Sequence, residues 1–313
     1  DYADMMAKVS KFSYEVRFLR AFYLFELAKR YGDIPLVTRT YTQEEINSIE
    51  KTPFVEVIDY IAKECSEIAL ELPADQSEVR NETGRVTKGA ALALKSRALL
   101  YAASALHNPD NDPTRWEAAA KAAYEVIAMG KYQLPKITAD ELYSDKGGHE
   151  VLKSKQLIFE RRATGKTNDF ESRNEPMGYE SAEGGNTPTQ NLVDAYELKD
   201  GTPFSWDNPV HVSNIYYDAE GKQTRDPRLY LNVLTNGATW LKQKVETFEG
   251  GKNKILDGST KTGYYLRKYM NPSVSLDPDK PNKLEHHYIL FRYAEILLNY
   301  AEAMNEWKGP DAM

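Results

Sequence analysis

The sequence predicts a mainly α-helical fold, in which pairs of helices form a scaffold and a large loop-rich region is inserted between them. Apolar residues recur at helical spacing up to about residue 131 and again after about residue 285. Between them, short apolar runs are broken by Gly, Pro, Asn and Asp. We therefore predict one domain over 1–313, with a scaffold at about 10–131 and 285–308 and an irregular region at about 132–284.

The first and last helices of the scaffold are predicted from their apolar periodicity. The first covers Tyr14–Tyr31, because Gly32, Asp33 and Pro35 disfavour further helix. Its buried side is predicted to be the apolar stripe Val16, Leu19, Phe22, Tyr23 and Leu27. The last covers about Glu285–Trp307, and its buried side is predicted to be Leu290, Ala294, Leu297, Leu298 and Ala301.

Three further helices are predicted from their end signals. One starts after Thr52, a plausible N-cap, with Pro53 in the first helical position, and it stops before a second proline. The next starts after Thr87, is rich in alanine and ends near Asn108. The last of the three is capped by Asp112 and carries Trp116 on its buried side. Helix pairs with small residues at their contacts predict a tetratricopeptide-like stack, although the spacing is too irregular for a strict repeat.

Two features stand out in the irregular region. Leu229, Leu231 and Val233 alternate up to the turn Asn236–Gly237, which predicts a β-hairpin with Trp240 on the returning strand. The stretch from Thr164 to Thr189 is rich in Gly, Asn, Ser and Glu, so it predicts a long polar loop in which Tyr179 is exposed. We expect short β-hairpins and loops, with no continuous sheet, in this region.

Composition excludes several classes of protein. The 40 basic and 47 acidic residues give a net charge of -7, and no basic run is present, so nucleic acid is not a predicted partner. No apolar stretch approaches the ~20 residues of a membrane-spanning helix. Cys65 is the single cysteine, which excludes a disulfide within the chain, and it lies on a helical apolar stripe where we expect it to be buried.

Motifs for catalysis, metal binding or nucleotide binding are absent from the sequence. Gly165-Lys166-Thr167 resembles the end of a phosphate-binding loop, but Glu160 stands where that loop needs its first glycine. Neither H-E-x-x-H nor G-x-S-x-G occurs. The five histidines lack the i, i+4 spacing of metal ligands on a helix; they are His107, His149, His211, His286 and His287. We therefore predict no catalytic residue, no metal site and no cofactor.

Aromatic residues are the candidate ligand contacts. The sequence has 21 Tyr against 10 Phe and 4 Trp, and a tyrosine ring with a polar tip suits a half-exposed recognition surface. Aromatic rings stack on the apolar faces of sugars, so we propose the aromatic residues of the irregular region as ligand-binding candidates. These are Trp206, Tyr216, Tyr217, Trp240 and Tyr179. Each has a competing role in the core, most of all Trp240 on its predicted hairpin.

Five segments, taken in order, resemble the SusD/RagB family. They are RFLRAFYLFELAKRYGDIPLV (17–37), GRVTKGAALALKSRALLYAA (84–103), PTQNLVDAYELKDG (188–201), RDPRLYLNVLTNGATW (225–240) and FRYAEILLNYAEAMNE (291–306). The resemblance covers nearly the whole chain. It implies a tetratricopeptide-like scaffold with a loop-rich ligand face, and a non-catalytic lipoprotein exposed on the cell surface at the outer membrane. Such a protein would bind glycan and deliver it to a SusC-like TonB-dependent transporter.

The lipid anchor implied by the resemblance has no counterpart among these residues. Cys65 cannot supply it, because the lipidated cysteine must be the mature N-terminus. We expect the export signal, the anchor and the N- and C-terminal family segments to lie outside 1–313.

Two other functions stay open. A helical glycoside hydrolase or lyase needs only two carboxylates in a cleft, which leave no sequence signature, and a repeat scaffold can bind a peptide on its concave face.

Overall fold

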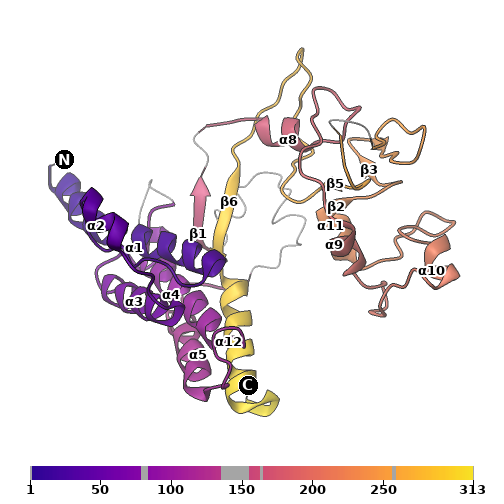
Figure 1. Cartoon of the computed structure of the whole chain (residues 1–313). Coiled ribbons are helices and arrows are strands. Elements are labelled where there is room, and N and C mark those ends of the chain that lie inside the picture. The colour runs from indigo at the N-terminus through magenta and orange to yellow at the C-terminus, as the bar shows by residue number, and fades with distance from the viewer. Residues whose placement is uncertain (1, 79–83, 135–154, 163–164, 256–258, 313) are drawn as a thin grey trace. The chain divides into compact units, whose positions relative to one another are not determined.

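The computed structural model describes residues 2–78, 84–134, 155–162, 165–255 and 259–312, and Figure 1 shows its elements. The described residues fall into two compact units. The first takes those within 1–135, 153–162 and 288–313, and the second takes those within 163–287. His149 and Thr164 lie outside the described residues. That the whole chain acts as one domain stays a prediction.

Helices build the first unit. They are α1 (Tyr2–Tyr31), α2 (Gln43–Ser48), α3 (Phe54–Ile68), α4 (Lys88–Ala103), α5 (Pro113–Ala128) and α12 (Tyr293–Lys308), with short 3-10 turns at Gln76–Glu78 and Pro310–Ala312. Successive long helices pack on one another: α1 on α3, α3 on α4, α4 on α5, and α5 on α12 (Figure 1). This arrangement confirms the predicted mainly α-helical scaffold of helix pairs.

The predicted starts of α4 and α5 and the predicted end of α1 are confirmed. The Thr87 hydroxyl accepts the N–H of Ala90 at 3.2 Å, and the Asp112 carboxylate accepts the N–H of Thr114 at 2.9 Å, so both residues are N-caps. Helix α4 ends at Ala103, earlier than predicted, because the Asn108 side chain bonds the Ala103 carbonyl at 3.3 Å.

The start of α3 was predicted wrongly. Its N-cap position is Pro53, which makes no side-chain cap, and Thr52 is not the cap. Asp33, which follows α1, supplies the missing acceptor, because its Oδ1 accepts the N–H of Phe54 at 2.8 Å. Next to it, Ile34 and Thr52 exchange two backbone hydrogen bonds of 3.2 and 2.9 Å. The end of α1 and the start of α3 are therefore tied together.

Helix α1 also differs from its prediction. It begins at Tyr2, because neither Gly nor Pro interrupts the residues before Tyr14. Its buried side is Phe18, Ala21, Leu24, Phe25 and Ala28, whereas Val16, Leu19, Tyr23 and Leu27 of the predicted stripe are exposed. Apolar residues lie on both sides of this helix, so periodicity could not select one of them. The side with two alanines faces the neighbouring helices, since small residues permit close approach.

The last helix is shorter than predicted. Residues His287–Arg292 form strand β6, which pairs with β1 (Leu157–Arg162), and α12 starts only at Tyr293. Its buried residues are Ile296, Asn299, Ala303 and Met304, while Leu298 of the predicted stripe is exposed. The aromatic and β-branched run HYILFR favours a strand over the first turns of a helix.

The core of the first unit confirms two other predictions. Cys65 is fully buried among the apolar residues of α1, α3 and α4. Trp116 is buried where α5 packs on α4 and α12, and its indole N–H donates to Asn111 at 3.0 Å. The rings of Phe18 and Phe159 meet edge to face at 5.2 Å and 81°, which fixes strand β1 against α1.

The second unit consists of short elements joined by turns. Its helices are α8 (Asp169–Asn174), α9 (Gln190–Asp194), α10 (Pro209–Ser213) and α11 (Pro227–Asn232). Strand β2 (Val233–Leu234) pairs antiparallel with β5 (Tyr265–Leu266), and β3 (Thr239–Trp240) pairs antiparallel with β4 (Gln243–Lys244). The loop-rich insertion with short hairpins is therefore confirmed.

The predicted hairpin around Asn236–Gly237 is wrong in its position. Leu229 and Leu231 are helical, because Asp226 caps α11 and Pro227 occupies its first position. The strand before the turn pairs with Tyr265–Leu266, not with the strand after it. The hairpin instead turns at Leu241 and Lys242, which both have positive φ angles of 45° and 66°.

The described residues contain neither a membrane-spanning helix nor a cluster of metal ligands. None of the helices in this part of the chain is long and apolar enough to span a bilayer. Within the same residues, no group of three or more His, Cys, Asp or Glu could hold a metal ion.

Candidate ligand-binding site

The five predicted aromatic contacts all lie in the second unit, but they differ in exposure. The Trp206 residue is 48% exposed, and Tyr216 and Tyr217 are half-buried. Trp240 and Tyr179 are only 3% and 8% exposed. Trp206 is therefore the candidate with a large open ring surface.

Trp240 and Tyr179 pack together in a core cluster with Tyr265 and Met270. The Tyr179 hydroxyl donates to the Trp240 carbonyl at 3.2 Å, which ties the two segments. The expectation that Tyr179 is exposed in a polar loop is wrong, because α8 interrupts that loop and the residues after it fold back onto the cluster. Both rings pack inside the protein.

Tyr216 and Tyr217 are adjacent in sequence and pack on different tyrosine rings. Tyr216 meets Tyr264 edge to face at 6.2 Å, whereas Tyr217 packs on Tyr230 at 5.5 Å. Tyr217 also lies over Gly237, where a Cβ atom would come within 3.5 Å of the ring. Burial raises the pKa of both phenols, so their hydroxyls stay protonated at neutral pH.

Trp206 is held by the residues around it. Its indole N–H donates to Asp194 Oδ1 at 3.1 Å. Phe204 meets the indole edge to face, with ring centres 5.1 Å apart and an angle of 82° between the planes. His211 packs against the same Phe204 at 5.8 Å, and its Nδ1 accepts the N–H of Ser205 at 3.1 Å. We call Phe204, Trp206 and His211 the aromatic platform.

A chain of hydrogen bonds runs from the aromatic platform into the protein. Asp194 Oδ1 accepts a second hydrogen bond from Gln190 Nε2 at 2.7 Å, one helical turn away on α9. The Gln190 side-chain carbonyl accepts from the Tyr264 hydroxyl at 2.9 Å, and the hydroxyls of Tyr264 and Tyr216 are 2.6 Å apart. The orientation of Trp206 is therefore set by residues far from it in sequence.

Arg225 supports the aromatic platform from below the surface. It is 1% exposed, and its guanidinium donates to the carbonyls of Val193, Tyr196 and Glu197 at the end of α9. Its Cζ lies 4.1 Å from the Phe204 ring centre. Burial lowers its pKa, but the guanidinium stays charged, since carbonyl dipoles at a helix C-terminus favour a cation. One side chain thus joins the segments 188–201 and 225–240.

Sequence reasoning found Trp206 and missed the residues that hold it. Gln190 and Asp194 have the i, i+4 spacing of a helical pair, which could have marked them as neighbours of one another. Their link to Trp206, and that of Phe204 to Arg225, depend on tertiary structure, and no local pattern signals it.

Two buried carboxylates also lie in this unit. Glu171 is fully buried and accepts hydrogen bonds from the Asn271 N–H at 2.9 Å and from His286 Nε2 at 3.0 Å. Glu175, 2% exposed, follows one turn later. Burial, with a smaller contribution from the neighbouring Glu171, raises the pKa of Glu175 to about 7. Both groups are enclosed, so neither is placed in an open cleft beside a substrate.

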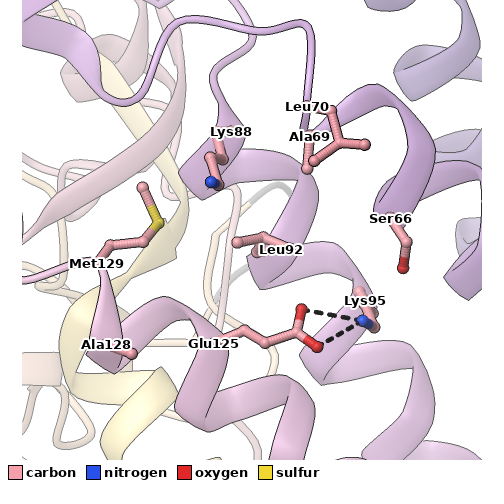
Figure 2. Close-up of a pocket in the computed structure, with 9 residues that line it drawn as sticks. All are labelled: Ser66, Ala69, Leu70, Lys88, Leu92, Lys95, Glu125, Ala128 and Met129. Carbon is pink, nitrogen blue, oxygen red and sulfur yellow. Dashed lines mark hydrogen bonds and ion pairs between the residues drawn. The ribbon is translucent and has the colours of Figure 1, made fainter.

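The first unit has a groove of about 460 Å³ between α3, α4 and α5. Figure 2 shows its lining residues, which are Ser66, Ala69, Leu70, Lys88, Leu92, Lys95, Glu125, Ala128 and Met129. Lys95 and Glu125 point toward one another, with N–O distances of 2.8 and 2.9 Å. No aromatic ring is among these lining residues, so the groove offers no stacking surface to a sugar.

Comparison with known families identifies relatives of the chain. A model described as the SusD family matches residues 155–313. A second, described as starch-binding and associating with the outer membrane, matches residues 5–100. No curated protein matches the chain.

Solved structures are similar over nearly all of the chain. A SusD-like carbohydrate-binding protein from Bacteroides fragilis has 28% identity and a TM-score of 0.77, over 96% of this chain and 56% of that one. Another SusD-like protein from Bacteroides fragilis has 30% identity and a TM-score of 0.74, over 98% and 60%. Surface glycan-binding protein A from Bacteroides uniformis shares the fold, with 16% identity and a TM-score of 0.58 over 97% and 56%. The chain thus spans less than two thirds of the length of these proteins.

Proposed function

We propose that this chain, which belongs to the SusD family, binds glycan through the aromatic platform and does not cleave it. The observation that carries the proposal is Trp206, an indole that is 48% exposed and yet fixed by Asp194 and Phe204. A ring held in place before binding loses little conformational entropy when a ligand stacks on it.

The chemistry of the aromatic platform suits a sugar. A pyranose presents C–H groups on one face and hydroxyl groups around its edge. An indole stacks against the former, and carboxylate or amide groups beside it bond the latter. Asp194, Gln190 and Asn208 provide such groups around the platform, on α9 and at the start of α10.

The relatives support the proposal by their described functions. One of the similar structures is described as carbohydrate-binding, and another as a surface glycan-binding protein. The model that matches residues 5–100 is described as associating with the outer membrane. We extend the proposal accordingly: the protein acts as a lipoprotein on the cell surface and passes its glycan to a SusC-like TonB-dependent transporter.

A glycan array probed with the purified chain tests the binding step. The expected result is binding to at least one polysaccharide, with no increase in reducing ends after prolonged incubation. New reducing ends would indicate a hydrolase, and a new unsaturated sugar end would indicate a lyase. Absence of binding to every glycan on the array, together with binding to a peptide library, would favour a peptide-binding scaffold instead.

A further inference from the structure

We infer that Asp194 makes the aromatic platform selective for uncharged glycans, by accepting a hydroxyl hydrogen and repelling carboxylated or sulfated sugars. This inference rests on the proposed function. Its starting point is the position of the carboxylate at the edge of a half-exposed indole.

The two oxygens of Asp194 have different surroundings. Oδ1 accepts both of the N–H groups that reach this side chain, at 2.7 Å from Gln190 Nε2 and 3.1 Å from Trp206 Nε1. No donor among the described residues bonds Oδ2, and Asp194 is only half-buried. A carboxylate oxygen without a donor retains its lone pairs and can take a hydrogen bond only as acceptor.

The ligand group that fits such an oxygen is a hydroxyl or another neutral donor. The carboxylate group of a uronate and a sulfate group have no hydrogen to donate, and Asp194 repels their charge at this short range. The structure therefore favours a neutral sugar beside Trp206 and disfavours an anionic one.

The charge of Arg225 attracts that of Asp194 through space, but the two groups are not joined by a hydrogen bond. Arg225 directs its guanidinium at the carbonyls of Val193, Tyr196 and Glu197, and makes no ion pair with Asp194. Asp207, next to Trp206 in sequence, is exposed and adds a second negative charge. The aromatic platform thus has an acidic edge.

Asp194→Asn separates the two roles of this residue. The amide oxygen of asparagine can still accept from Gln190 and Trp206, so the indole keeps its support, while Oδ2 becomes an NH₂ donor and the charge is lost. Glu220→Gln is the matched control, since Glu220 is exposed in the same unit and its side chain makes no hydrogen bond within the described residues.

The experiment measures dissociation constants by calorimetry for the strongest neutral glycan of the array and for the same glycan carboxylated at C6. The parent chain should bind the neutral form at least about tenfold more tightly. Asp194→Asn should shrink this preference at least about fivefold, with an unchanged melting temperature, and Glu220→Gln should leave it unchanged.

The outcomes separate this inference from the proposed function. Equal binding of both forms by the parent, or an unchanged preference in Asp194→Asn, overturns the role of Asp194 while glycan binding stands. A parent chain that binds no glycan on the array overturns both.

Discussion

The guanidinium of Arg225 lies 4.1 Å from the centre of the Phe204 ring, and the indole of Trp206 meets the same ring edge to face at 5.1 Å. A buried cation therefore supports an exposed ring through one phenyl group. Arginine suits this position, because its planar guanidinium stacks on a ring while it donates to several carbonyls.

Arg225→Lys should destabilise the protein by about 2–5 kcal/mol, since lysine cannot reach all three carbonyls or stack in the same way. Urea unfolding measures the loss. The control is Arg228→Lys, where an exposed arginine pairs with Asp226 two residues away, and the change should stay within about 1 kcal/mol. Similar losses in the two variants would contradict the role given to Arg225.

Trp206→Ala should weaken glycan binding by more than about 1 kcal/mol and leave the melting temperature unchanged, because the ring is half exposed. Trp240→Ala should lower the melting temperature and leave glycan affinity unchanged, since that ring lies in the core. Calorimetry and thermal unfolding of both variants provide the check. Phe248→Ala removes another exposed aromatic of the same unit and serves as the control. Unchanged affinity in Trp206→Ala would remove the aromatic platform from the binding site.

Tyr179→Ala should cost about 3–5 kcal/mol, as other large-to-small changes of buried aromatic residues do. In the first unit, Ile61→Ala should cost about 2–5 kcal/mol through the cavity it leaves, because Ile61 is fully buried. Leu70→Ala is the control at a residue that is 79% exposed, and its effect should stay within about 0.5 kcal/mol. A Tyr179 variant as stable as the parent in urea would place that ring outside the core.

Glu175 should make stability depend on pH. Its pKa is raised from 4.5 to about 7 by burial, so the folded protein favours the protonated form. The free energy of unfolding should then fall by up to about 3 kcal/mol as the pH rises from 4.5 to about 7, and it should stay at the lower value above that pH. Glu175→Gln cannot ionise and should lack this loss.

The comparison is made by urea unfolding at about pH 4.5 and pH 8. Glu175→Gln should match the parent at the lower pH and exceed it at the higher. Glu220→Gln, at an exposed carboxylate, should have the same free energy of unfolding as the parent at both pH values. The same pH profile in the parent and in Glu175→Gln would mean that folding does not raise the pKa of Glu175.

Local signals in the sequence correctly predicted the starts of α4 and α5. Caps such as Thr87 and Asp112 act within a few residues, so their effect can be read from the residues that follow them. The buried side of α1 could not be predicted, because its two sides are both apolar and only packing selects Phe18 and Phe25 over Val16.

In the candidate site, too, burial depends on packing that local sequence signals do not show. Trp206 and Trp240 look alike in sequence, each within a turn-rich region. Their difference comes from the residues they meet, Asp194 for one and Tyr179 with Tyr265 for the other, and those contacts join segments distant in the chain. The type of these two residues can be read from the sequence, but their exposure depends on those distant contacts.

The hydrogen bonds from Asp33 to Phe54 and between Ile34 and Thr52 close the segment that carries α2 into a loop with fixed ends. Its central residues are mostly exposed, and exposed polar loops are preferred sites for proteases. A protease that cuts within Gln43–Ser48 would leave α1 and α3 still bonded and packed on either side of the cut. The nicked protein should therefore elute from gel filtration as the intact one does, and separate into two fragments only in denaturant.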